Sequence, residues 1–221
     1  MTGASANREL IWDWPVRLSH WSFAVLVPAM WYTADNSLWW WHTRLGMALL
    51  AVLVFRILWG FVGSQTARFA SFVKGPGAIV DYLKGESTVT TGHNPLGALS
   101  VIALLTAMCL QVGMGLFSGD PYDGATGPLN GFVGVMTADM ITDWHKTFVW
   151  VLAALVAVHL AAIAFYAAFK RTNLVGPMIT GKRALPVGKG IEPASNRAAL
   201  ITLGIATVLA VWIWFGAPPF G

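Results

Sequence analysis

The sequence is poor in charge. Charged residues make up 11% of its 221 residues and hydrophobic residues make up 56%, whereas soluble domains carry about 25% charged residues. The length would permit one or two small soluble domains, but the long apolar runs leave little sequence for them. The composition therefore indicates an integral-membrane protein, with membrane lipid as its surroundings.

Cysteine is also scarce. Cys109 is the single cysteine in the chain, which excludes an intramolecular disulfide. The C-x-x-C-H motif that attaches haem covalently does not occur in the sequence. Any haem in this protein would therefore be held without thioether links.

A nucleic-acid-binding surface is not indicated either. The net charge is +4, but the basic residues are spread over several short loops and form no stripe or recognised motif. A one-sided distribution across a membrane explains them better. We therefore expect no nucleic-acid partner.

Five apolar stretches approach the roughly 20 residues that a helix needs to cross the hydrocarbon core. They cover residues 15–34, 42–62, 96–117, 143–169 and 198–217. The first stretch lacks a small-residue cleavage site and follows Glu9 and Asp13, so we expect a retained helix rather than a cleaved signal peptide. The pair Asn94–Pro95 predicts the start of the third helix, because asparagine caps helices and proline suits the first helical turn. Connectors rich in Gly, Pro and Asp separate the stretches, for example residues 119–124.

The lysines and arginines predict the orientation. With the N-terminus on the cytoplasmic side, twelve of the 14 basic residues lie inside and only Arg44 and Lys146 lie outside. Cytoplasmic loops of membrane proteins carry such an excess. We therefore expect a multi-pass protein of the bacterial inner membrane, with a cytoplasmic N-terminus and a periplasmic C-terminus.

Histidines are the main candidates for chemistry, because ionisable residues in membrane helices are costly and usually functional. His145 and His159 are 14 residues apart, which is about 21 Å along a helix and nearly on one face. By depth, His42 is level with His145 toward the outside, and His20 is level with His159 toward the inside. The sequence therefore predicts two stacked pairs of imidazoles.

Haem suits such pairs better than a free metal ion does. Zinc prefers four ligands in a tetrahedron, and each level offers two histidines and no cysteine. Haem supplies four equatorial nitrogens itself and needs only two axial ligands, which imidazole provides. We therefore predict two b haems, the outer one held by His42 and His145 and the inner one by His20 and His159. A six-coordinate haem leaves no open position for substrate, so the expected role is electron transfer. Hydrogen-bonded packing is the alternative for any single histidine.

Two arginines are further candidates for cofactor binding. Arg56 lies 14 residues beyond His42 on the second helix, level with the inner haem. It either pairs with a haem propionate or extends to the cytoplasmic interface. Arg17 precedes His20 by three residues and has the same two alternatives.

Other polar and small residues support the helices. Gln111 is expected to form a hydrogen bond between helices. Gly113 and Gly115 would let either a porphyrin or a neighbouring helix approach the backbone. His93 has no partner at its depth, so a structural role is favoured over a position near a haem edge or a quinone.

Four segments resemble a known family. The stretch Trp14–Trp21 is similar to a "W-P-x-R-x-x-H-W" start, and residues 55–63 and 93–97 are similar to the end of the second helix and the start of the third. The pair Trp144–His145, with His159 and the basic tail 170–175, resembles the fourth helix. The chain resembles the superfamily of prokaryotic cytochrome b561 and nickel–iron hydrogenase cytochrome b over about residues 10–183.

The resemblance implies a four-helix core with two b haems ligated through His20, His42, His145 and His159, and exchange with the quinone pool. The fold class that we predict is an all-α integral-membrane protein. A four-helix transmembrane bundle holding two b haems would occupy residues 1–183. A linker and a fifth transmembrane helix would occupy residues 184–221.

Several functions fit this fold. We expect electron transfer between the quinone pool and a periplasmic redox partner such as a c-type cytochrome, and the protein could act as a quinone-linked oxidoreductase. The alternative is a cytochrome b anchor subunit of a hydrogenase or dehydrogenase. A function of a different class is a small proton-coupled transporter, with the intramembrane histidines as a proton relay.

Overall fold

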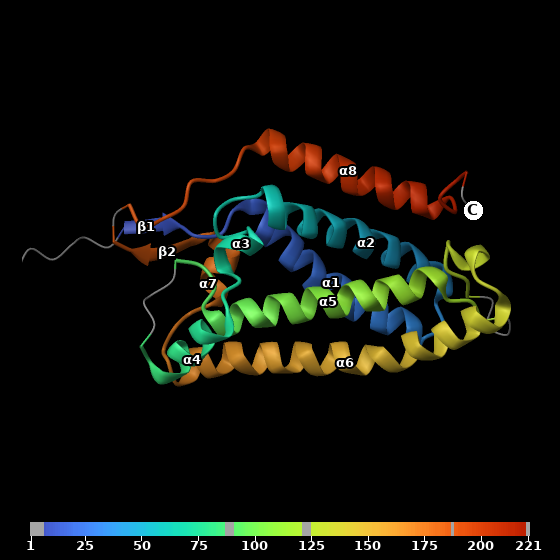
Figure 1. Cartoon of the computed structure of the whole chain (residues 1–221), viewed down its shortest axis with the longest axis horizontal. Coiled ribbons are helices and arrows are strands. Elements are labelled where there is room, and N and C mark those ends of the chain that lie inside the picture. The colour runs from blue at the N-terminus through green and yellow to red at the C-terminus, as the bar shows by residue number, and fades with distance from the viewer. Residues whose placement is uncertain (1–6, 87–90, 121–124, 187, 220–221) are drawn as a thin grey trace, which may run out of the picture. The chain divides into compact units, whose positions relative to one another are not determined.

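The computed structural model describes residues 7–86, 91–120, 125–186 and 188–219, and this part of the chain is mostly helical (Figure 1). In chain order, the elements are β1 (Asn7–Leu10), α1 (Trp14–Asp35), α2 (Trp39–Val62), α3 (Phe69–Phe72), α4 (Pro76–Lys84), α5 (Pro95–Phe117), η1 (Asn130–Phe132), α6 (Val135–Ala168), α7 (Val175–Thr180), β2 (Lys182–Leu185) and α8 (Asn196–Trp214).

Four of the described helices, α2, α5, α6 and α8, are long and apolar enough to cross a membrane. This confirms the expectation of a helical membrane protein. Helix α1 has 22 residues, which is also sufficient length, but it is less apolar because Arg17, Ser19 and His20 lie in its first two turns. A fifth crossing through α1 remains a prediction.

The observed helix ends are close to the predicted ones, with one large difference. Helix α6 begins at Val135 rather than at residue 143. The additional residues include Asp139, which lies within α6 beyond its first turn. The predicted cap of α5 is confirmed, because the backbone N–H of Gly97 donates to Asn94 Oδ1 over 2.7 Å. Of the predicted connector 119–124, residues 121–124 lie outside the described residues.

The chain divides into two compact units, and each long helix contributes to both. Unit 1 comprises residues 1–18, 56–103 and 157–201. In it, β1 and β2 pair as antiparallel strands with Asn7 opposite Leu185, and α7 lies beside β2 (Figure 1). Its apolar core is centred on Ile11, Trp12 and Trp59. No sequence pattern predicted these strands.

Unit 2 comprises residues 19–55, 104–156 and 202–221. Helices α1 and α6 contact each other there through Trp31 and Trp150, whose ring centres are 4.9 Å apart. The segment after α5 is joined to α6, because the N–H of Gly119 donates to the buried Thr142 hydroxyl of α6 over 3.0 Å. These contacts join α1 and the end of α5 to α6 within this unit.

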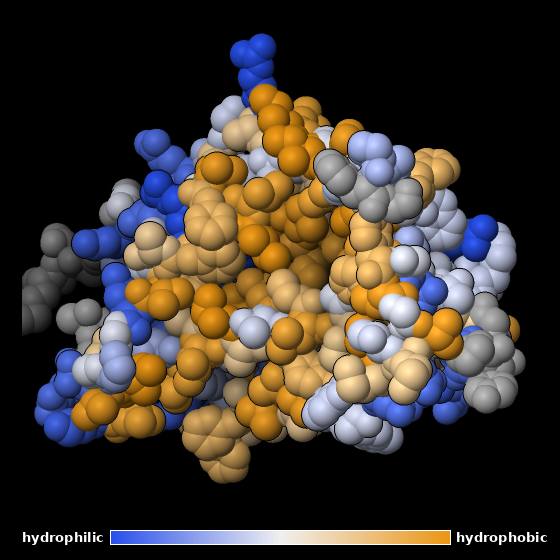
Figure 2. Space-filling view, turned by 45° about the vertical axis from the view of Figure 1, so that its right-hand side comes forward, coloured by the Kyte–Doolittle hydropathy of each residue, from blue (hydrophilic) through white to orange (hydrophobic). Residues whose placement is uncertain are grey.

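Apolar side chains cover much of the visible surface (Figure 2). Several large hydrophobic residues of α6 and α8 are more than half exposed, including Val158, Leu160 and Val208. Water would not favour such a surface, whereas lipid does. The surface therefore agrees with a membrane location.

Candidate functional site

His42 of α2 and His145 of α6 lie together in unit 2. Their ring centres are 6.3 Å apart and their planes are nearly perpendicular, at 86°. Both side chains are half-buried. The structure thus brings together the two histidines that the sequence analysis assigned to one site.

Backbone carbonyls orient both rings. His42 Nδ1 lies 3.1 Å from the carbonyl oxygen of Met30, and His145 Nδ1 lies 3.0 Å from the carbonyl oxygen of Gln111. A carbonyl oxygen only accepts hydrogen bonds, so Nδ1 carries the proton in both neutral rings. The lone pair then resides on Nε2 of each ring, which is the arrangement of a metal-bound histidine.

The separation of the rings fits one metal between them. A metal–imidazole bond of about 2.0–2.1 Å, with about 1.1 Å from nitrogen to ring centre, places two rings on one metal about 6.3 Å apart. The observed separation is 6.3 Å. Within the described residues, no group of three or more His, Cys, Asp or Glu side chains could hold a bare metal ion. A two-histidine site therefore fits haem, which brings its own four nitrogens.

Small and polar residues of α5 support His145. A Cβ added at Gly115 would lie 3.1 Å from His145 Cε1 and 3.7 Å from Nε2, so glycine leaves the space that the ring needs. The side chain of Gln111 donates to the carbonyl oxygen of His145 over 3.0 Å. This confirms the predicted hydrogen bond between helices. The hydroxyl of Thr33 lies 3.2 Å from His42 Nδ1 and gives that ring a second contact.

The other predicted pair is divided between the units. His20 lies on α1 in unit 2, with its ring edge-on to Trp21 at 5.1 Å between centres. His159 lies on α6 in unit 1. Both side chains are half-buried. The inner pair therefore remains a prediction.

The two candidate arginines lie in unit 1 in different surroundings. Arg17 donates from Nη1 to the carbonyl oxygen of Ile179 over 2.6 Å, which joins α1 to α7. Arg56 is buried, with 5% of its surface exposed, and its guanidinium carbon lies 5.5 Å from the centre of the Phe69 ring. Burial to this extent does not fit the alternative that Arg56 extends into water.

Asp13 is a buried residue that the sequence analysis did not select. Its carboxylate accepts the backbone N–H of Val16 over 3.0 Å and the indole N–H of Trp59 over 2.9 Å. It therefore caps α1 and joins this helix to α2. An aspartate two residues before Pro15 is a typical helix start, and this signal could have identified it.

His93 packs between two aromatic rings in unit 1. Its ring centre is 4.6 Å from that of Trp12 and 4.6 Å from that of Phe72. Burial, and then the positive charge of Arg56, lower the pKa of His93 to about 3. The imidazole is therefore neutral at physiological pH.

Hydroxyl groups meet near the start of α5. The amide of Asn94 donates to Tyr82 Oη over 3.0 Å and to Tyr166 Oη over 2.8 Å, and the two phenols also share a hydrogen bond. Burial and the Tyr166 hydroxyl raise the pKa of Tyr82 to about 12. The cluster holds α4, α5 and α6 together in unit 1.

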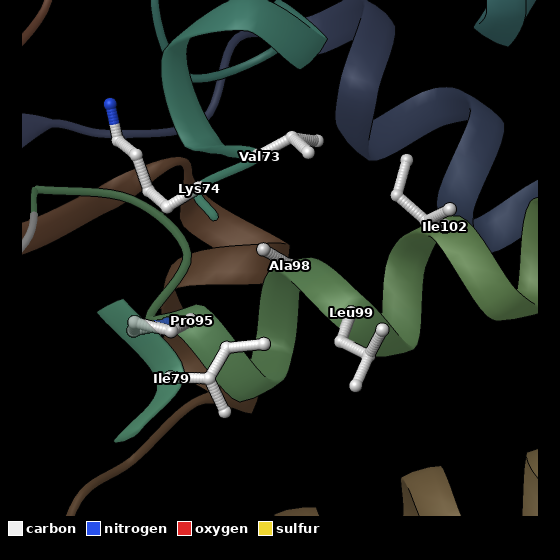
Figure 3. Close-up of a pocket in the computed structure, with 7 residues that line it drawn as sticks. All are labelled: Val73, Lys74, Ile79, Pro95, Ala98, Leu99 and Ile102. Atoms are coloured by element: carbon white, nitrogen blue, oxygen red, sulfur yellow. The ribbon is translucent and has the colours of Figure 1, made fainter. Parts of the chain in front are cut away.

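An apolar hollow lies in unit 1 (Figure 3). It has a volume of about 100 Å³, and aliphatic side chains of α5, of α4 and of the segment between α3 and α4 line it. Lys74 is the one charged residue of the lining. The complete lining is Val73, Lys74, Ile79, Pro95, Ala98, Leu99 and Ile102.

Comparison with known proteins agrees with this geometry. The family model described as prokaryotic cytochrome b561 matches residues 11–181. The chain is 25% identical over 209 residues to a probable Ni/Fe-hydrogenase B-type cytochrome subunit of Bradyrhizobium diazoefficiens, with 78% of this chain and 85% of the relative covered. No solved structure matches the chain. The predicted resemblance is confirmed, and the chain belongs to the prokaryotic cytochrome b561 family of membrane-bound, haem-containing electron-transport proteins.

Proposed function

We propose that the protein carries electrons across the bacterial inner membrane through two b haems, between the quinone pool and a redox partner on the periplasmic side. His42 and His145 hold the outer haem, and His20 and His159 hold the inner haem. When bound, haem iron accepts and releases one electron without needing a free coordination position. The N-terminus is cytoplasmic and the C-terminus is periplasmic.

The observation that carries this proposal is the His42–His145 pair. Its ring centres are separated by 6.3 Å, and both Nδ1 atoms face carbonyl oxygens. Packing alone would not require both imidazoles to keep Nε2 available for a metal. The haem core would occupy residues 1–183, with residues 184–221 as the linker and the additional helix.

Arg17 and Arg56 are proposed to face the propionates of the inner haem. Arg56 supports this assignment because it is buried with 5% exposure. Arg17 supports it less directly, because one of its N–H groups is already bound to Ile179. For Arg17, anchoring of the cytoplasmic interface is the alternative.

The apolar hollow is a candidate site for the quinone tail. Its lining is aliphatic apart from Lys74, and its volume of about 100 Å³ accommodates part of an apolar tail rather than a whole ligand. It lies in the same unit as His159. A quinone bound there would exchange electrons with the inner haem.

The absorption spectrum of the purified protein tests the haem proposal. We expect a reduced spectrum of low-spin b haem and two haems per chain. His42→Ala should remove the outer haem and His159→Ala the inner haem, each leaving the other spectrum in place. A colourless protein would instead favour the proton-coupled transporter. Loss of the outer haem alone in His159→Ala would contradict the pairing.

A second candidate function is that of a cytochrome subunit in a hydrogenase or dehydrogenase complex. The name of the Bradyrhizobium relative, a probable Ni/Fe-hydrogenase subunit, favours this candidate. Purification of the tagged protein from native membranes distinguishes the two. A co-purifying hydrogenase or dehydrogenase subunit supports the complex, and a c-type cytochrome supports direct exchange with a soluble carrier.

A further inference from the structure

Unit 1 contains a buried polar group of residues that the proposed haem ligands do not use. Arg56 enters it from α2, and its guanidinium carbon lies 5.5 Å from the centre of the Phe69 ring. His93 enters it from the segment before α5, between the rings of Trp12 and Phe72. Phe69 and Phe72 are adjacent, with ring centres 5.8 Å apart. One aromatic wall therefore borders both polar side chains.

Each of these side chains has a buried polar atom without a partner. Arg56 Nη1 and His93 Nδ1 are both inaccessible to water and form no hydrogen bond with any of the described residues. Buried polar atoms in folded proteins almost always have a partner, so an exception points to a water molecule or to a bound group. Arg56 itself is 5% exposed, which makes the unused donor costly.

Asp13 is not the missing partner of the Arg56 guanidinium. It lies close enough for its negative charge to act on Arg56, but no ion pair links the two side chains. Its two oxygens accept the N–H groups of Val16 and Trp59. The carboxylate is therefore committed to holding α1 against α2.

The hydrogen-bonding properties of Arg56 Nη1 and His93 Nδ1 indicate which kind of ligand they would bind. A guanidinium N–H only donates, and its planar fork matches the two oxygens of a carboxylate. Neutral His93 donates from Nδ1 in one of its two tautomers, and its ring packs at a tilt against Trp12 and Phe72. Two buried donors that lack an acceptor among the described residues suit one carboxylate better than they suit a neutral ligand.

We propose that Arg56 and His93 together bind one carboxylate group. Its source is either a propionate of the inner haem, in which case the inference rests on the proposed function, or a free small carboxylate. The sequence analysis favoured a structural role for His93. Its unpaired Nδ1 beside the charge of Arg56 gives it a binding role instead.

Infrared spectroscopy of the purified, haem-loaded protein distinguishes the two sources. In one sample, the propionate carboxyl carbons of the haem carry ¹³C. In another, ¹³C-acetate is exchanged into the unlabelled protein before desalting. The variants are Arg56→Gln and His93→Phe, the second of which keeps an aromatic ring between Trp12 and Phe72. Arg44→Gln is the matched control, because Arg44 lies on the same helix but is exposed over the Trp40 ring.

If the bound group is a haem propionate, the infrared band of the ¹³C-labelled propionate carboxylate should shift in both variants and remain in place in Arg44→Gln. Arg56→Gln should also make reduction of one haem about tenfold less favourable, a fall of about 59 mV in its midpoint potential. If the bound group is a free carboxylate, the infrared band of ¹³C-acetate should remain in the desalted wild-type protein and be absent from both variants.

Two results would overturn the inference. If neither labelled band responds to the variants while both haems are retained, the two atoms bind only water. The assignment of Arg56 to a haem propionate then falls, whereas electron transfer through two haems is unaffected. If one variant shifts a band and the other does not, Arg56 and His93 do not share a ligand. Should Arg56→Gln fail to fold, Arg56→Lys keeps the charge without the fork, and its band should still shift. Absence of haem from the wild type would instead contradict the proposed function.

Discussion

Replacement of Gly115 by valine should release the outer haem. The Cβ that the substitution adds would lie 3.1 Å from Cε1 of His145 and 3.5 Å from Nδ1. Ordinary contacts of this kind begin at about 3.4 Å, and the two γ carbons of valine extend further from the backbone. The His145 ring must therefore move, and its hydrogen bond of 3.0 Å to the carbonyl oxygen of Gln111 is lost or weakened.

The size of the effect follows from these contacts. Overfilling a packed site costs about 1–3 kcal/mol, which corresponds to about a 5- to 140-fold loss of haem affinity. Loss of the group that orients a metal-bound histidine costs about 10- to 100-fold by itself. We therefore expect a loss of about one to two orders of magnitude in affinity for the outer haem, and an unchanged inner haem.

Gly113→Val is the matched control. Gly113 lies on the same helix, and apart from its own chain neighbours and the adjacent helix backbone, no heavy atom of the described residues lies within 4 Å of the Cβ that would be added there. Both substitutions change helix propensity equally, so only contact with His145 distinguishes them. The assay is the haem content per chain, with titration of haem into the depleted protein. Equal haem content and equal spectra in the two variants would refute the assignment of His145 as a ligand beside Gly115.

Three further outcomes are expected. Thr33→Val should retain both haems and weaken the outer one by less than tenfold, because the Met30 carbonyl still orients His42 when the hydroxyl contact of 3.2 Å is removed; haem titration measures this. Burial and the charge of Arg56 lower the pKa of His93 to about 3, so below its ordinary pKa of about 6.5 only the unfolded chain gains this proton. In protein depleted of haem and of free carboxylate, the free energy of unfolding should then fall by about 1.4 kcal/mol per pH unit from pH 6.5 toward 3. A bound carboxylate would raise the pKa of His93 and reduce this slope. Denaturation of the depleted protein in detergent should show that His93→Phe removes this part of the acid sensitivity, and an unchanged slope would contradict the prediction. Leu99→Trp should fill the apolar hollow and raise the KM for a soluble quinone analogue with little change in haem content; an unchanged KM would place the quinone elsewhere.

Much of the helical fold was predictable because membrane helices leave long apolar runs. The start of α5 was predictable from Asn94–Pro95, because side-chain caps are local in sequence. The pairing of β1 with β2 was not, because Asn7 meets Leu185 across most of the chain. Four-residue strands carry no periodicity that marks them out, and their partners are determined by the helices between them.

The outer site was predictable in part. Depth along the helices brought His42 and His145 to the same level, and their contact in the structure agrees with this pairing. The groups that orient them were not predictable, because the acceptors are backbone carbonyls of Met30 and Gln111 and every residue has a carbonyl. The surroundings of His93 were not predictable, because Trp12, Phe72 and Arg56 lie far from it in sequence.

The pairing of β1 with β2 also bears on how many times the chain crosses the bilayer. Hydrogen-bonded strands must lie on the same side of the membrane, so the chain between Leu10 and Lys182 crosses it an even number of times. Among the described residues of that interval, three helices, α2, α5 and α6, are apolar enough to cross, and three is an odd number. An even number requires one more crossing, for which α1 is the candidate in spite of its arginine and histidine. A crossing by α8 would then place the end of that helix on the side opposite the strands.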